Sequence, residues 1–226
     1  MRYLIVNADD FGASPGVNHG IYDSHCRGIV TSTSLMVDGP ACEEAALLAR
    51  LAPRLGLGLH VDLGGWDRTG RTTEALLAEL NRQVGRFVEW IGRAPSHVDS
   101  HRDVHRDPEL IPAFEELARR WSVPLRGRSA VRPLSKFYGQ WAGESHPEHL
   151  AVESLARILA SGVEEGVTEL VCHPGYCDGR LVSSYLRERE VEVETLCDPR
   201  TRGVLADLGI ELTNYDALGR LVPSPR

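Results

Sequence analysis

Four short stretches of the 226-residue sequence contain side chains whose types and spacing suit hydrolytic chemistry. They are NADDFG at Asn7–Gly12, GLHVDL around His60, SHVDSHRDVH at residues 96–105 and CHPGY at Cys172–Tyr176. Aspartate and histidine together can hold a divalent ion with open positions for water and substrate, and such an ion lowers the pKa of its water toward ~7. A spare carboxylate can take the water proton and a spare histidine can protonate the leaving group. The four stretches therefore indicate a metal-dependent hydrolase.

Each stretch also has a purely structural interpretation. The first suits a strand-to-helix turn in which Gly12 allows a positive φ, and His60 suits a hydrogen-bonded core position. A turn with a buried cysteine explains CHPGY, whereas a zinc site at Cys172 and Cys177 lacks a second cysteine pair. The stretch at 96–105 is the hardest to explain by packing, because crowded ionisable groups are costly unless they bind a metal or a substrate.

Short apolar runs alternate with helical patterns, which is typical of an α/β fold with a largely parallel sheet. We expect strands at Tyr3–Ala8, Ser32–Val37, Leu57–Leu63, His97–Asp99 and Glu169–Cys172. Helices with one apolar face are expected over residues 77–91, 110–121 and 152–159. All four chemical stretches fall at the carboxyl ends of expected strands, which a parallel barrel gathers into one bowl.

Two further local signals concern helix starts and a long connection. Aspartate followed by proline, at Asp107–Pro108 and Asp198–Pro199, predicts a capping residue and the first helical position. Residues 126–149 have no clear period, so we expect a long loop over the bowl, with room for one short strand.

Composition and charge restrict the class of protein. A chain with 42% hydrophobic and 25% charged residues suits one globular domain spanning residues 1–226. The formal net charge of -7 argues against nucleic acid or an anionic membrane as the main partner. No apolar run approaches the roughly 20 residues that span a bilayer, so membrane insertion is not expected. Five cysteines, an odd number, favour reduced thiols and a cytoplasmic location.

The motifs resemble those of the YdjC-like family of carbohydrate deacetylases over nearly the whole chain. The most specific pairing is NADDFG with the pattern DSH..VH at residues 99–105, and the match extends to residues 28–34, 58–60, 172–176 and 183–199. The resemblance implies a deformed, incomplete (β/α) TIM-like barrel with one bound divalent ion, Mg²⁺ or Zn²⁺. It also implies removal of an N-acetyl group from an amino sugar, with a small carbohydrate as the partner.

The resemblance also implies a role for each matching residue. The metal ligands would be Asp10, His60 and His101. Asp9 would be the general base, by analogy with metal-dependent deacetylases that use adjacent aspartates, and His173 would be the general acid. The residues expected to orient these groups or to contact substrate are His97, Asp99, Arg102, His105, Arg126 and Tyr176.

One departure from the family concerns the substrate. Family members often carry SHHHVH where this chain has SHRDVH at residues 100–105, so Arg102 and Asp103 replace two imidazoles. Arg102 either binds a phosphate or carboxylate on the sugar or is solvated, and Arg126 and Arg128 present the same alternatives.

Three alternative functions stay open at this point: a phosphoesterase, another amidohydrolase and a sugar-binding protein. The same chemistry serves a phosphoesterase or another amidohydrolase, and a second metal would favour phosphoester chemistry because paired ions hold both the attacking and the leaving oxygen. A metal-containing sugar-binding protein without catalysis is a different class, against which the intact Asp9 and His173 argue. An exposed apolar helix face would indicate a homodimer.

Overall fold

The computed structural model describes residues 1–64 and 72–221, and a parallel sheet lies at its centre. The strands of this sheet are β1 (Arg2–Phe11), β2 (Ser32–Leu35), β3 (Gly56–Val61), β4 (Val98–Ser100), β5 (Val131–Leu134), β8 (Gly166–Cys172) and β9 (Ile210–Thr213). They follow the order β4-β3-β2-β1-β8-β5, and β9 pairs with the first half of β1. Within the described residues no pairing joins β4 to β5, so the barrel is incomplete.

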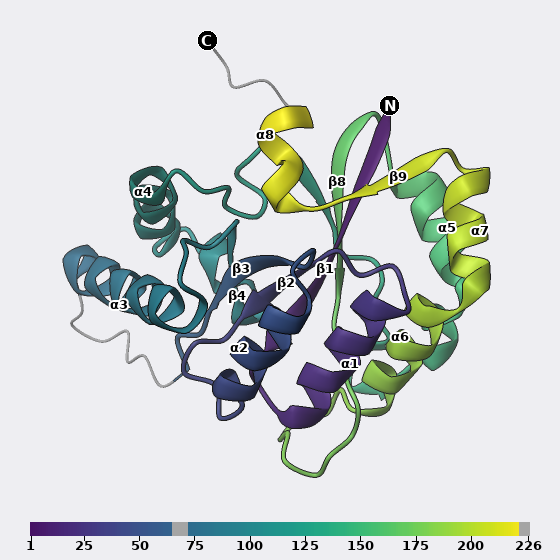
Figure 1. Ribbon diagram of the computed structural model, residues 1–226, viewed down its shortest axis with the longest axis horizontal. Coiled ribbons are helices and arrows are strands. Elements are labelled where there is room, and N and C mark those ends of the chain that lie inside the picture. Colours follow the sequence, from purple (N-terminus) through teal and green to yellow (C-terminus); the bar gives the residue numbers. More distant parts are fainter. Residues whose placement is uncertain (65–71, 222–226) are drawn as a thin grey trace.

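Helices lie around the outside of this curled sheet (Figure 1). They are α1 (Pro15–Cys26), α2 (Cys42–Leu51), α3 (Thr73–Ile91), α4 (Ile111–Trp121), α5 (Val152–Gly162), α6 (Arg187–Cys197), α7 (Pro199–Asp207) and α8 (Leu218–Leu221). In Figure 1, α3 and α4 lie on the left, α1 and α2 in front, and α5, α6 and α7 on the right. Short 3-10 helices and a hairpin lie between them: η1 (His101–Arg106), η2 (Pro147–Leu150), η3 (Tyr215–Ala217), β6 (Gln140–Trp141) and β7 (Glu144–Ser145). The deformed, incomplete (β/α) barrel that the sequence predicted is confirmed.

Strand β1 is central and almost wholly buried. Leu4, Ile5, Val6 and Ala8 have no exposed surface, and β1 pairs with β2 and β8 on its two sides. A parallel strand covered on both faces reads as a continuous apolar run, which is why the sequence predicts it well. The run ends at two aspartates, so the most buried strand delivers two carboxylates to the rim of the barrel.

The connection at residues 126–149 is more ordered than predicted. It contributes β5 to the edge of the main sheet and contains the hairpin of β6 and β7. Its strand signal is weak because Arg132 and Pro133, in the middle of β5, are exposed. A short edge strand with polar or proline residues has neither an apolar run nor an alternating pattern.

The two predicted helix starts have different outcomes. Asp198 caps α7 as predicted, since its side chain accepts a hydrogen bond from the backbone N–H of Arg200. The prediction at Asp107–Pro108 is wrong, because α4 begins at Ile111. The Asp107 carboxylate accepts a hydrogen bond from the backbone N–H of Glu109 at 2.9 Å, which closes a turn before the helix instead of capping it.

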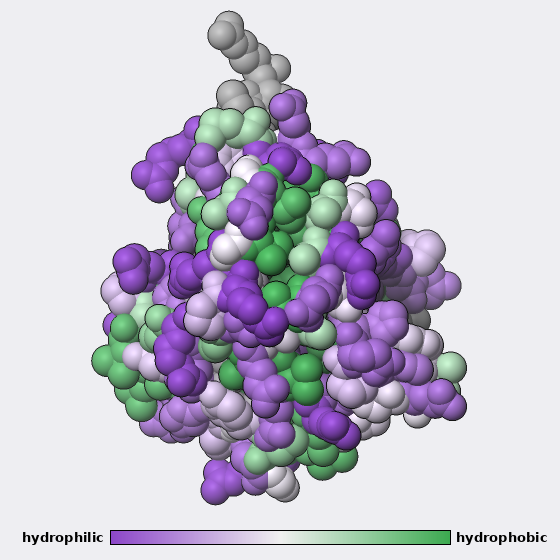
Figure 2. Space-filling view, turned by 90° about the vertical axis from the view of Figure 1, so that its right-hand side faces the viewer, coloured by the Kyte–Doolittle hydropathy of each residue, from purple (hydrophilic) through white to green (hydrophobic). Residues whose placement is uncertain are grey.

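Polar and charged side chains cover most of the face that carries α5 and α7, with apolar side chains showing between them (Figure 2). None of the helices in residues 1–64 and 72–221 combines the length and apolarity needed to cross a bilayer. On α2, Leu47 and Leu51 form a small exposed apolar face, with 54% and 68% of their surface exposed. Two residues are too few to define an interface, so a homodimer stays a prediction.

Candidate active site

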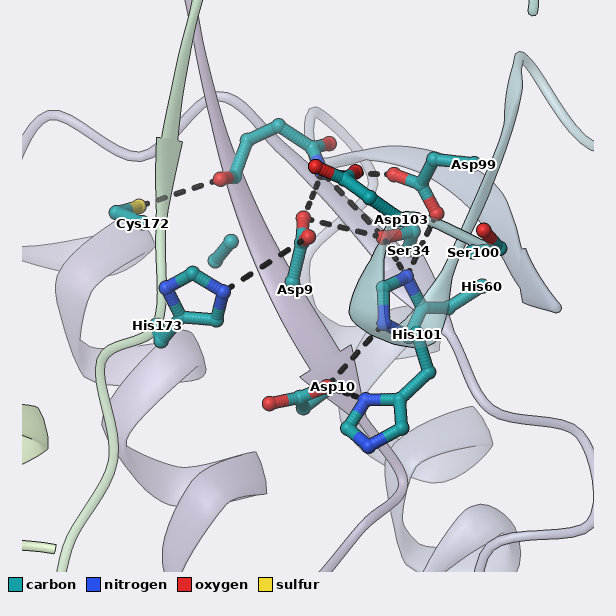
Figure 3. A network of polar contacts seen from close by, with 12 residues as sticks. Asp9, Asp10, Ser34, His60, Asp99, Ser100, His101, Asp103, Cys172 and His173 are labelled. Atoms are coloured by element: carbon teal, nitrogen blue, oxygen red, sulfur yellow. Dashed lines mark hydrogen bonds and ion pairs between the residues drawn. The ribbon is translucent and has the colours of Figure 1, made fainter. Parts of the chain in front are cut away.

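Side chains from the four predicted stretches meet in one cavity at the carboxyl ends of the strands. The cavity has a volume of about 830 Å³. Its lining includes Asp9, Asp10, His60, Ser100, His101, Arg102, Asp103, Arg126 and His173. In Figure 3 the two aspartates of β1 lie between His173 on one side and His60 and His101 on the other. The prediction that the strand ends form one bowl is confirmed.

Both aspartates of β1 line the cavity, although consecutive residues of a regular strand point to opposite faces. Two features of the backbone explain this. Asp10 has a φ of 70°, in the left-handed region, and the pairing of β1 with β2 shifts register between Ala8 and Phe11. The resulting irregularity turns Asp10 back toward the side that Asp9 already faces.

Asp10, His60 and His101 form the best candidate for a metal site. Asp10 Oδ1 lies 3.2 Å from His60 Nε2 and 3.1 Å from His101 Nδ1. Metal–ligand distances of about 2.1 Å place neighbouring ligand atoms roughly 3.0–3.4 Å apart, so both distances from Asp10 suit one divalent ion. All three donor atoms lie within 4.8 Å of one another. The His101 side chain is 33% exposed, which leaves one side of the donor group open to the cavity.

Asp99 and Arg189 hold two of these donors in place, Asp99 on His60 and Arg189 on Asp10. His60 donates from Nδ1 to Asp99 Oδ1 at 2.7 Å, which leaves Nε2 facing Asp10. An imidazole that binds a metal commonly donates its other N–H to a carboxylate in this way. On Asp10, burial would raise the carboxyl pKa, but hydrogen bonds from His101 and His60 and the charge of Arg189 hold this pKa well below its ordinary value. Asp10 is therefore an anion ready to bind a cation.

Arg126 lines the cavity but is almost wholly buried, and its charge is already balanced by three carboxylates. Its two terminal nitrogens donate to both oxygens of Asp9 at 2.8 Å and 2.7 Å. The guanidinium also lies 2.7 Å from Asp99 Oδ2 and 2.8 Å from Glu169 Oε1. The bidentate contact between Arg126 and Asp9 fixes the orientation of the Asp9 carboxylate. By contrast, Arg128 is 55% exposed and pairs with Glu115 at the surface.

Replacing Arg126 with Met is expected to lower the free energy of unfolding by about 3–5 kcal/mol, because three buried carboxylates lose their shared cation. Arg128→Met is the matched control, and it should change the free energy by less than about 0.5 kcal/mol because its ion pair is exposed. Denaturant unfolding of both variants measures the difference. A loss below about 1 kcal/mol for Arg126→Met would show that the buried cluster does not depend on this cation.

His173 follows β8 and faces Asp9 across the cavity. Its Nε2 lies 4.0 Å from Asp9 Oδ2, and its side chain is 24% exposed (Figure 3). Burial lowers the pKa of His173, so the imidazole is neutral near pH 7. Both polar groups of the His173 backbone are hydrogen-bonded. The N–H donates to Glu192, and the carbonyl accepts from Arg189 at 3.2 Å.

Arg189 and Glu192 are site residues that the sequence did not indicate. Arg189 donates to Asp10 Oδ2 at 2.5 Å, and Glu192 accepts from the backbone of His173. Both lie on α6, whose sequence REREVEVETLC reads as an exposed, highly charged helix. Only their burial, 6% exposed for Arg189 and 0% for Glu192, distinguishes them from their solvated neighbours.

Several other predicted residues lie away from the cavity. His97 is fully buried and stacks on Tyr215 with 3.8 Å between ring centroids, and His105 Nδ1 bonds to Ser100 Oγ at 2.6 Å. Tyr176 does not lie at the site, because its hydroxyl donates to Asp23 of α1 at 2.7 Å. Arg102 does line the cavity, and it and Asp103 both have left-handed backbones, with φ of 57° and 53°.

Burial lowers the pKa of His97 from 6.5 to about 4, which makes stability depend on pH. Below pH 6.5 the unfolded chain takes up a proton that the folded chain excludes, so the free energy of unfolding should fall by about 3 kcal/mol as the pH drops to about 4. In His97→Gln this contribution disappears and the fall should be smaller by that amount. Denaturant unfolding of chelator-treated protein at several pH values tests this, and equal falls in both proteins would contradict it.

An incomplete parallel barrel with an aspartate and two histidines gathered at its strand ends defines an α/β protein with a candidate divalent-metal site. The chain belongs to the YdjC-like protein family, whose model matches residues 3–207. It is 36% identical to the carbohydrate deacetylase of Geobacillus stearothermophilus, over 95% of this chain and 97% of the relative. It is 34% identical to the chitooligosaccharide deacetylase of Serratia marcescens, over 96% of this chain and 99% of the relative.

Solved structures agree with the observed fold. An Enterococcus faecalis protein assigned to cellobiose-phosphate cleavage superimposes with a TM-score of 0.80 at 31% identity, covering 96% of this chain and 98% of that one. A family 4 acetyl xylan esterase from Clostridium thermocellum superimposes with a TM-score of 0.61 at 14% identity, covering 97% of this chain and 91% of that one. The second likeness concerns the fold alone.

Proposed function

We propose that this protein is a metal-dependent carbohydrate deacetylase that removes the N-acetyl group from an amino sugar, such as an N-acetylglucosamine oligosaccharide. The observation that carries the proposal is the placement of Asp9, fixed by Arg126, beside the donor group Asp10, His60 and His101 in one cavity. Full-length relatives named carbohydrate and chitooligosaccharide deacetylase, at 36% and 34% identity, support the choice of reaction.

The donor group suits one divalent ion, held by Asp10, His60 and His101. When bound, such an ion supplies Lewis acidity, which polarises an amide carbonyl and makes water easier to deprotonate near neutral pH. Two imidazoles and one carboxylate are typical of zinc, while magnesium prefers an all-oxygen environment and is the alternative.

The residues of the chain then divide the proton transfers between them. Asp9 accepts a proton from the attacking water, and Arg126 holds that carboxylate in place through both of its oxygens. The water oxygen bonds to the acetyl carbon, the amide C–N bond breaks, and acetate and a free amine leave. His173 is neutral and lies 4.0 Å from Asp9, so it takes this proton over from Asp9 and passes it to the departing nitrogen.

A single ion favours amide hydrolysis over phosphoester hydrolysis. Two further donor groups lie close enough for an ion, Asp9 with His60 and Asp99, and His97 with Asp99 and Glu169. Both include carboxylates that already pair with Arg126, so the guanidinium supplies the positive charge there. Asp10 pairs with Arg189 only through Oδ2, which leaves its Oδ1 to the two histidines. Paired ions, which phosphoester chemistry commonly uses, therefore have only one favourable position.

Acetate release from N-acetylglucosamine, chitobiose, chitotriose and their phosphorylated forms tests the proposal, with p-nitrophenyl phosphate as the phosphoester control. We expect acetate from at least one sugar, abolished by chelator, and no phosphate release. Phosphate release without acetate would favour a phosphoesterase. Tight binding of chitobiose with no acetate would favour a sugar-binding protein without catalysis. Two further predictions do not depend on the reaction: a cytoplasmic location and a homodimer.

A further inference from the structure

One wall of the cavity is aromatic. Tyr138, in the connection between β5 and β6, stacks on Tyr185 with 4.6 Å between ring centroids and 3° between the ring planes. Both rings line the cavity, and Tyr138 is 39% exposed while Tyr185 is 5% exposed. Tyr185 covers one face of the Tyr138 ring, which leaves the rest of that ring available to a ligand.

A buried carboxylate holds this aromatic pair in place. The Tyr185 hydroxyl donates to Glu192 Oε1 at 2.6 Å and accepts from the backbone N–H of Gly139 at 3.0 Å. Glu192 has no exposed surface, and burial raises its pKa to about 8. The other oxygen of Glu192 accepts from the backbone N–H of His173. Burying a carboxyl group costs free energy, and the buried Glu192 carboxyl connects the tyrosine pair to His173, the candidate general acid.

The position of the pair fits one part of the substrate. During deacetylation the nitrogen leaves with the sugar, so the sugar ring must lie on the side of the group that protonates the nitrogen. His173 is that group, and its ring centroid lies 5.9 Å from the centroids of both Tyr138 and Tyr185. A pyranose ring has C–H groups on its faces, and these carry a small positive charge that suits the negative face of an aromatic ring.

We propose that Tyr138, held by Tyr185 and Glu192, is the platform on which the pyranose ring of the acetylated sugar stacks. The proposal deepens the deacetylase function and depends on it for the identity of the ligand. Its role is binding and not chemistry, because the metal donors, Asp9 and His173 already account for the reacting groups. It therefore predicts an effect on affinity for the sugar more than on turnover.

Tyr138→Leu tests the platform by replacing the aromatic ring with an apolar side chain. We expect KM for chitobiose to rise about tenfold, with kcat changed less than about threefold, because stacking is lost in the bound complex. Tyr138→Phe keeps the ring and should stay within about twofold of the parent KM. Isothermal titration of chitobiose should show the same loss of affinity in the leucine variant.

Trp141→Leu is the matched control, because Trp141 is equally exposed at 43% but stacks on His146 and is absent from the cavity lining. The inference is wrong if Tyr138→Leu leaves both KM and the dissociation constant unchanged, or if Trp141→Leu raises them equally. If the parent protein binds chitobiose without releasing acetate, the deacetylase function fails, and the titration still decides on the platform. A melting temperature within a few degrees of the parent confirms that each variant is folded.

Discussion

Replacing Asp9 with Asn should abolish acetate release while leaving the divalent metal bound. Asp9 lies outside the donor group of Asp10, His60 and His101, so the change should not remove a ligand. The amide cannot accept a proton from water, and loss of a general base costs about 10²–10⁴ in rate. Steady-state kinetics together with metal analysis of the same sample measures both parts of the expectation.

Glu169→Gln is the matched control for Asp9→Asn. Glu169 is also a buried carboxylate on Arg126, at 2.8 Å, but it does not line the cavity. Both variants remove one negative charge from the same cation, and only one removes the proposed base. We expect Glu169→Gln to keep kcat within about tenfold of the parent. Asp9→Asn with more than a tenth of the parent activity would show that another group is the base.

Replacing His101 with Ala should release the metal and with it the activity. His101 supplies one of the three donors, and its partly exposed side chain carries little of the core packing. Loss of an outer partner alone weakens metal binding by about 10–100-fold, so loss of a ligand should exceed about 100-fold. Metal analysis after dialysis, followed by titration with zinc or magnesium, gives the affinity.

His105→Gln separates loss of a ligand from a general disturbance of the same stretch. His105 lies four residues further along, is 1% exposed, and bonds to Ser100 instead of the donor group. The His105→Gln variant should have a lower free energy of unfolding than the parent and should still bind one equivalent of metal. A His101→Ala protein that retains one equivalent after dialysis would remove His101 from the ligand set.

The sequence predicted those parts of the site that lie at the ends of apolar strands. Asp9, Asp10, His60 and His173 each follow or end a buried strand, so a local pattern was enough to predict that they meet. The partners of these groups could not be predicted in this way. Arg126 pairs with Asp9 from 117 positions away, and Arg189 with Asp10 from 179, and no local pattern encodes such contacts.

Two residues show why local signals mislead at this site. Tyr176 immediately follows the PG pair after His173, yet its hydroxyl donates to Asp23 of α1 and its side chain is absent from the cavity lining. Arg126 sits in a stretch that predicts a long loop over the bowl, and its burial follows from the three carboxylates that the barrel gathers around it. In both cases tertiary contacts decide the environment of the side chain.

Catalysis should depend on one divalent ion held by Asp10, His60 and His101. The most direct test adds zinc or magnesium in steps to chelator-treated protein and measures acetate release from chitobiose at each step. We predict no release without metal, a linear rise, and a break at one equivalent. Full release from metal-free protein would show that catalysis needs no metal, and a rise that continues to two equivalents would show that one ion is not enough.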